Sequence, residues 1–166
     1  LVGQSVALAG NSGDRRLQAS RLYLLGTILL ESGEVDSALE DYQQARIKYQ
    51  ELNERFNEAM VLVGISQVHY LNNHFVEARA LLFETLQILK EHGAEAHSGI
   101  AYINLGEIET DMGLLDEAET HLYEGLKVSN QTGSHRVKAA NQAALGRLFL
   151  KQGRLAEAKP LIDTAL

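Results

Sequence analysis

Histidine is the residue of this chain best suited to catalysis or metal binding, but the six histidines are poorly arranged for either. His69 and His74 are five residues apart and lie on different helix faces, and His92 and His97 lie on either side of a turn. His121 and His135 have no partner at ligand spacing. A zinc site needs about four Cys or His ligands at recognisable spacing, and the chain has no cysteine. We therefore predict no metal and no cofactor.

The acidic residues Glu107 and Glu109 are also poorly placed for catalysis. Residues two apart on a helix point to different faces, so these carboxylates are not positioned as an acid–base pair. The glycine-rich loops that hold phosphates are absent as well. We predict no catalytic residue in this chain and no enzyme activity.

The strongest pattern is a repeat with a period of 40 residues. Three copies share a Leu-Gly pair, a later Gly and then an Ala: Leu25, Gly26, Gly33 and Ala38; Leu105, Gly106, Gly113 and Ala118; Leu145, Gly146, Gly153 and Ala158. The remaining copy keeps the Ala and changes the other positions conservatively: Ile65, Ser66, Asn73 and Ala78. A fixed period of this size predicts a solenoid in which each repeat contacts its neighbours.

Each period contains two amphipathic helical patterns that are separated by Gly or Asn. The predicted helices are 15–31, 35–51, 55–72, 75–91, 95–112, 115–131, 135–152 and 155–166, and 1–10 is the second half of a preceding helix. Gly and Asn adopt the left-handed conformation that commonly ends a helix, and they occupy two turn columns: Gly33, Asn73, Gly113, Gly153, and Gly13, Asn53, Gly93, Gly133. The mid-helix column of Gly26, Ser66, Gly106 and Gly146 indicates close packing against the Ala column.

The Leu-Gly, Gly and Ala pattern resembles the tetratricopeptide repeat (TPR) over the whole chain, in a long form similar to kinesin light chain-like proteins and bacterial signalling regulators. The period is 40 rather than 34, and the family's early Trp is replaced by Leu22, Leu62, Tyr102 and Gln142. The resemblance implies an all-α, right-handed superhelical solenoid of antiparallel helix pairs. We expect a single domain over 1–166, with about four repeats (15–54, 55–94, 95–134 and a truncated 135–166) after a partial helix and turn at 1–14.

The resemblance also implies that the first helix of each repeat lines a concave groove. The candidate binding residues on that face are Tyr23, Thr27, Leu30, Met60, Val63, Gln67, Tyr70, Ile100, Ile103, Asn104, Glu107 and Arg147. A largely apolar face with a central polar stripe suits a peptide or an amphipathic helix of a partner protein. The alternative is that some of these columns belong to the core between helices.

Charge is distributed unevenly along the chain. Residues 95–134 contain eight acidic residues and one basic residue, whereas 135–166 contain six basic and two acidic residues. Glu107 shares a column with Arg147, and Asp111 shares one with Lys151, so we expect ion pairs between adjacent repeats. The alternative is that these charges meet a ligand that carries both signs.

Three functional hypotheses follow. The first is a protein-interaction module that binds a protein or peptide partner in its groove. The second is a sensor or autoinhibitory arm of a larger multidomain regulator, and the third is self-association into a homo-oligomer through apolar surfaces at the ends, Leu1 and Leu166. The net charge of −7 argues against direct nucleic-acid binding. No apolar run reaches the ~18 residues of a membrane span, so we expect no membrane insertion and a cytoplasmic location.

Overall fold

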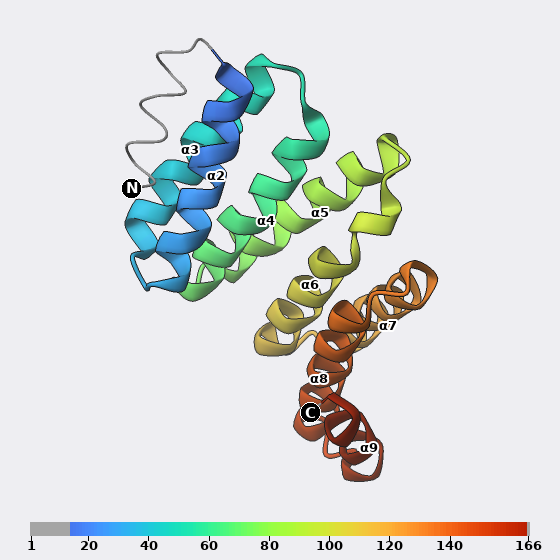
Figure 1. The fold of residues 1–166 in the computed structure, drawn as a ribbon. Helices are drawn as coiled ribbons and strands as arrows, with labels where there is room; N and C mark the ends of the chain where they lie inside the picture. Colours follow the sequence, from blue (N-terminus) through green and yellow to red (C-terminus); the bar gives the residue numbers. More distant parts are fainter. Residues whose placement is uncertain (1–13, 166) are drawn as a thin grey trace. The chain divides into compact units, whose positions relative to one another are not determined.

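The computed structural model describes residues 14–165, and throughout that range the regular structure is helical (Figure 1). The elements are α2 (Arg15–Glu31), α3 (Val35–Glu51), α4 (Arg55–Leu71), α5 (Phe75–Glu91), a short 3₁₀ helix η1 (Glu95–His97), α6 (Gly99–Met112), α7 (Leu115–Thr132), α8 (His135–Lys151) and α9 (Leu155–Ala165). The predicted helix at 1–10 and the turn at Gly13 lie outside the described residues.

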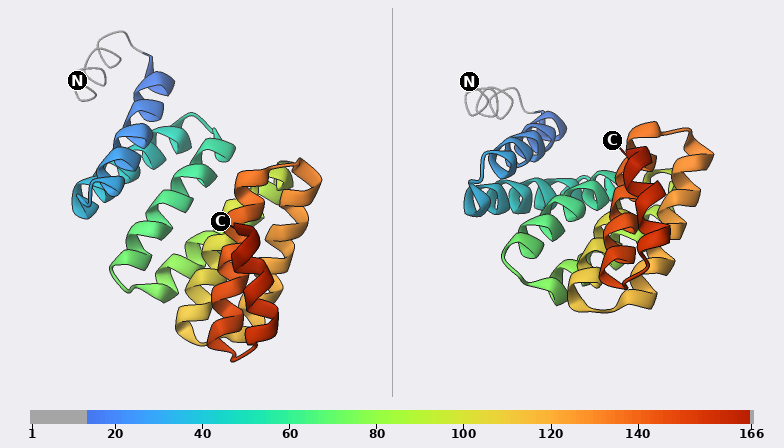
Figure 2. Two further views of the ribbon diagram at one scale, coloured as in Figure 1. Left: turned by 60° about the horizontal axis from the view of Figure 1, so that its bottom comes forward. Right: turned by 90° about the horizontal axis from the view of Figure 1, so that it is seen from below.

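The chain divides into two compact units, Leu1–Ile88 and Leu89–Leu166, and the division falls within α5. In the first unit, α3 packs against both α2 and α4. In the second unit, α6 with α7 and α8 with α9 form successive helix pairs, and α8 also contacts α6 and α7 (Figure 2). These pairs are the helical hairpins that the 40-residue period predicts.

The predicted helix bounds agree with the structure to within one residue at all but one position. The exception is the start of the helix predicted at 95–112, where η1 precedes a helix that begins only at Gly99. The hydroxyl of Ser98 donates to the carbonyl of Glu95 at 2.6 Å, and serine side chains that bond the local backbone compete with helix formation. Gly99 follows directly, and glycine is a weak helix former.

The turn columns have the left-handed backbone that the sequence predicts. All seven described members have positive φ, from 54° at Asn53 to 86° at Gly33. At each turn an amide beyond the left-handed residue donates back into the helix, for example Glu34 N to Leu29 O at 2.9 Å and Arg154 N to Phe149 O at 2.8 Å. These bonds satisfy carbonyls that the helix end would otherwise leave unpaired. Every described turn therefore ends its helix by the same mechanism.

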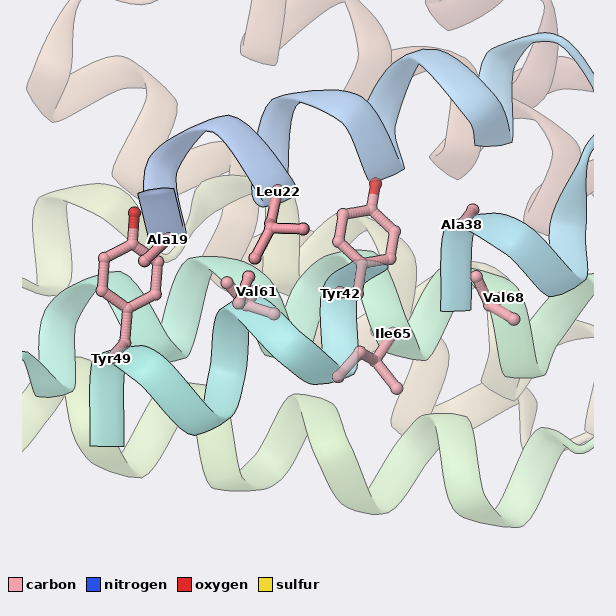
Figure 3. Close-up of a cluster of buried hydrophobic side chains, with 9 residues drawn as sticks. Ala19, Leu22, Ala38, Tyr42, Tyr49, Val61, Ile65 and Val68 are labelled. Atoms are coloured by element: carbon pink, nitrogen blue, oxygen red, sulfur yellow. The ribbon is translucent and has the colours of Figure 1, made fainter. Parts of the chain in front are cut away.

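The core of the first unit is built around Tyr42 of α3, whose ring is buried between α2 and α4 (Figure 3). Its hydroxyl donates to Thr27 Oγ1 at 3.2 Å. A Cβ placed at Gly26 of α2 would lie 2.9 Å from the ring, and one at Gly64 of α4 would lie 2.6 Å from it. Both helices approach the ring closely because these two positions carry no side chain.

Close packing at the mid-helix glycine column is therefore present, but the closest contact is not the Ala column. At Gly106 the nearest atoms belong to Leu122, and at Gly146 they belong to Ile162, each four residues after the column's alanine. The alanines are fully buried, and their small size lets the helix approach. The large side chain one turn later fills the space over the glycine.

Alkaline pH is expected to destabilise the fold through its buried tyrosines. Burial raises the pKa of Tyr42 and of Tyr49 above the ordinary value of 10.0. Above pH 10 the unfolded chain loses phenolic protons that the folded chain retains, so the free energy of unfolding falls as pH rises. Urea titrations between about pH 8 and pH 11 would measure this slope, and a Tyr42→Phe/Tyr49→Phe variant should show a smaller one. An unchanged slope in the double variant would contradict this assignment.

Candidate interaction surfaces

The second unit has a small charged cavity between α6 and α8. It has a volume of about 130 Å³, and its lining comprises Glu107, Thr110 and Asp111 of α6 and Ala144, Arg147 and Lys151 of α8. These residues come from columns that the sequence places on the first-helix face or directly beside it. The cavity is thus formed where adjacent first helices run next to each other.

Ion pairs cross this cavity as the shared columns predict. Arg147 pairs with Glu107, and Lys151 Nζ lies 3.9 Å from Asp111 Oδ1 while also donating to the carbonyl of Thr110 at 2.5 Å. The side chains remain accessible, since Arg147 is 60% and Lys151 is 44% exposed. Exposed pairs contribute only ~0.2–1 kcal/mol each, so a bound molecule's charges can replace them at small cost.

In the first unit, part of the predicted face packs inward. The Thr27 hydroxyl donates to the Tyr23 carbonyl at 3.0 Å and accepts from Tyr42, and the Tyr23 ring lies 5.9 Å from that of Tyr42. Leu30 packs against the same core. Burial raises the pKa of Tyr23. These side chains support the hairpin rather than an open surface.

The other candidate residues range from exposed to buried. Gln67 and Ile100 are exposed, and those that are partly buried are Met60, Val63, Tyr70 and Asn104. The Tyr70 ring packs 5.8 Å from that of Phe75. Ile103 is 7% exposed and lies in the core of the second unit. At Ile103 the structure therefore corresponds to the alternative interpretation, in which a column belongs to the core between helices.

Two glutamates are completely buried, one in each unit, and sequence reasoning identified neither. Glu58 of α4 accepts from Arg46 Nε at 3.3 Å and Gln50 Nε2 at 2.6 Å, and it also pairs with Arg55. Arg46 in turn donates through Nη2 to Glu84 at 2.9 Å. This network joins α3, α4 and α5 around the buried carboxylate of Glu58, while Arg46, Arg55 and Glu84 remain partly exposed. The feature of the sequence that could have indicated this network is Arg46, a charged residue in a column that holds Leu86 and Leu126 in later repeats.

The second buried carboxylate is Glu109 of α6. Its Oε2 lies 2.6 Å from Nδ1 of His121 on α7, and the imidazole stacks on the ring of Tyr102 at 6.2 Å between centroids. His69 and His74 were expected on different helix faces. In the structure their rings lie close together across a turn, with 5.8 Å between the ring centroids. Within residues 14–165, no group of three or more His, Asp or Glu is placed to hold a metal ion.

Apolar side chains are exposed on one stripe of α2, where Leu17, Leu24 and Ile28 are 38%, 53% and 50% accessible. Val68, one period after Ile28, is fully buried. The self-association hypothesis concerned the ends at Leu1 and Leu166, which lie outside the described residues. No helix in the described part of the chain is both long and apolar enough to span a bilayer.

Comparison with known proteins agrees with this architecture. No curated protein sequence matches the chain. Among solved structures, BtubC (BKLC) from P. vanneervenii is 19% identical with a TM-score of 0.78, over 92% of this chain and 63% of that one. A Rap protein complexed with competence and sporulation factor is 19% identical with a TM-score of 0.81, over 90% and 42%.

A third structure, of the nearly identical TPR-like repeats of a Podosopora anserina putative kinesin light chain, is 18% identical with a TM-score of 0.69, over 99% of this chain and 82% of that one. The chain spans less than two thirds of the BtubC and Rap chains. Together these structures show the fold to be an all-α, TPR-like solenoid. Residues 6–166 match the family described as the MalT-like TPR region, and the chain therefore belongs to that family.

Proposed function

We propose that this chain is a protein-interaction module that binds a peptide or helix of a partner on the faces of its first helices. The observation that carries the proposal is the cavity between α6 and α8, where Glu107, Asp111, Arg147 and Lys151 present both signs of charge. A partner segment with acidic and basic side chains can exchange its charges for the internal pairs. The charge complementarity selects the partner more than it adds affinity.

The first unit supports the same function with uncharged groups. Gln67 of α4 is exposed, and Met60, Val63 and Tyr70 of the same helix are partly buried. Aromatic and Met side chains are enriched where proteins bind one another. The similar Rap structure was solved with a bound factor, which is a precedent for this fold. The regulatory-arm hypothesis depends on sequence beyond this chain and stays a hypothesis.

Reversing the charge on the α8 side of the cavity is expected to weaken peptide binding at least about tenfold, or roughly 1.4 kcal/mol. Peptides would first be selected from a random display library against the native chain. Their affinities for the native chain and for an Arg147→Glu/Lys151→Glu variant would then be measured by fluorescence anisotropy. The loss is expected because both reversed residues would repel acidic side chains and could no longer balance Glu107 and Asp111.

The matched control is Arg136→Glu/Lys159→Glu, which changes the net charge equally at two basic positions that do not line the cavity. This control should bind the selected peptides as the native chain does. Circular dichroism would verify that both variants keep their helicity. Equal loss of affinity in both variants, or peptides that bind the cavity variant normally, would reject the proposed surface.

A further inference from the structure

The first unit contains a cavity among α3, α4 and α5 that is larger than the one between α6 and α8. Its volume is about 530 Å³, within the range of small-molecule sites. It is lined by Gln43, Arg46, Ile47 and Gln50 of α3, Ile65 and His69 of α4, and Leu81 of α5. We call it the α3–α5 cavity. It shares no residue with the proposed peptide surface.

The repeat shows how the lining of this cavity differs from the equivalent residues of the second unit. Four of its columns recur 80 residues later as Leu126, Leu145, Phe149 and Leu161, and in the second unit these side chains belong to or pack against one apolar core. The first unit has Arg46 where the later repeat has Leu126, and His69 where it has Phe149. Polar side chains thus stand at two lining positions that are apolar in the second unit, which gives this cavity hydrogen-bonding groups that the later repeat lacks.

The charged groups around the cavity already balance one another. Arg46 is bound to Glu58 and to Glu84, and Glu58 is also bound to Arg55. A charged ligand would have to compete with these internal ion pairs for a counterion. The remaining polar lining consists of two amides and the His69 imidazole, which hydrogen-bond neutral groups equally well.

We propose that the α3–α5 cavity binds a small, uncharged molecule that combines an aromatic ring with a hydrogen-bonding amide or hydroxyl group. The ring lies among Ile47, Ile65 and Leu81, beside the imidazole of His69. The polar group bonds to the His69 imidazole, and the amides of Gln43 and Gln50 lie on the same cavity wall. A ligand held there contacts three helices of two successive hairpins, so it also stabilises their packing.

The chain contains no tryptophan, so the fluorescence of an indole probe reports binding without a protein background. N-acetyl-L-tryptophanamide would be titrated with the full chain, and indole-3-acetate and tryptamine would serve as anionic and cationic comparators. We expect the neutral amide to bind with a blue-shifted emission and at least about tenfold more tightly than either charged probe. Methyl NMR signals of Ile65 and Leu81 should shift in the same titration.

The decisive variant is His69→Phe, which places the aromatic residue of the later repeat at this position and removes the hydrogen-bonding ring nitrogens from the cavity lining. It should bind the amide at least about tenfold more weakly while its melting temperature is unchanged or higher. His135→Phe makes the same substitution at an exposed histidine outside the cavity and should bind like the native chain. If His69→Phe unfolds the chain, Ile47→Ser at an exposed lining position provides the second test, with an expected several-fold loss.

Absence of binding by the native chain, equal affinity for the three probes, or undiminished affinity in a folded His69→Phe variant would each overturn the proposal. None of these results bears on the peptide surface between α6 and α8, which is tested by different residues. The two proposals can therefore fail independently.

Discussion

Tyr42→Ala is expected to lower the free energy of unfolding by about 3–5 kcal/mol, the usual cost of deleting a buried aromatic side chain. Tyr42 is only 2% exposed, and its ring fills the space between Gly26 and Gly64. The substitution also removes the hydrogen bond to Thr27. Chemical denaturation monitored by circular dichroism would measure the loss. A loss below about 1 kcal/mol would show that this ring does not hold the first unit together.

The same contact predicts that the effect of Gly64→Ala on stability depends on the residue at position 42 and changes sign when Tyr42 is replaced. Gly64→Ala in the native chain should cost about 1–3 kcal/mol, because the new methyl group overlaps the Tyr42 ring. In a Tyr42→Leu background it should stabilise by up to about 1 kcal/mol, since alanine favours the helix more than glycine does. The two substitutions together would reproduce Leu122 and Ala144, which occupy these two columns in the second unit. Equal effects of Gly64→Ala in both backgrounds would contradict the proposed overlap.

His121→Leu is expected to destabilise the second unit by about 3–5 kcal/mol, because it removes the Nδ1 contact from a completely buried carboxylate. The double variant Glu109→Leu/His121→Leu should recover most of this loss, since replacing both members of a buried polar pair with apolar residues is often neutral or stabilising. The chain contains a natural precedent, because the same two columns hold Phe149 and Leu161 in the next hairpin.

A double-mutant cycle from urea unfolding would quantify this coupling. As a control, His135→Leu at an exposed position should change stability by less than about 0.5 kcal/mol. Additive losses from the two single substitutions would show that Glu109 and His121 do not act as a pair.

The helices and turns could be predicted from the sequence because their causes are local and recur. Gly33 and Asn73 mark helix ends through their backbone preference alone, and one period sets the positions of all the others. The inter-repeat ion pairs of Arg147 and Lys151 were also predictable, because residues in one column of adjacent repeats are neighbours in a solenoid.

The buried polar contacts could not be predicted in the same way. Glu109 and His121 lie on two helices of a hairpin, and their contact depends on how those helices align, which no local pattern specifies. Thr27 and Ile103 lie on the predicted face, yet the Thr27 hydroxyl accepts from Tyr42 and Ile103 belongs to the core of the second unit. The useful signal was departure from a column: a charged residue where other repeats have apolar ones, as at Arg46 and Glu109.

The identical turns have a consequence for how the chain folds. Because each described turn ends its helix through the same left-handed residue, hairpins from different repeats resemble one another, and mispaired assembly is a hazard for arrays of this kind. The contacts of the buried Glu58 cross from one hairpin to the next, because its carboxylate accepts from Arg46 and Gln50 of α3. A hairpin that docked on the wrong neighbour would bury this carboxylate without those donors, so Glu58 discriminates in favour of the correct neighbour.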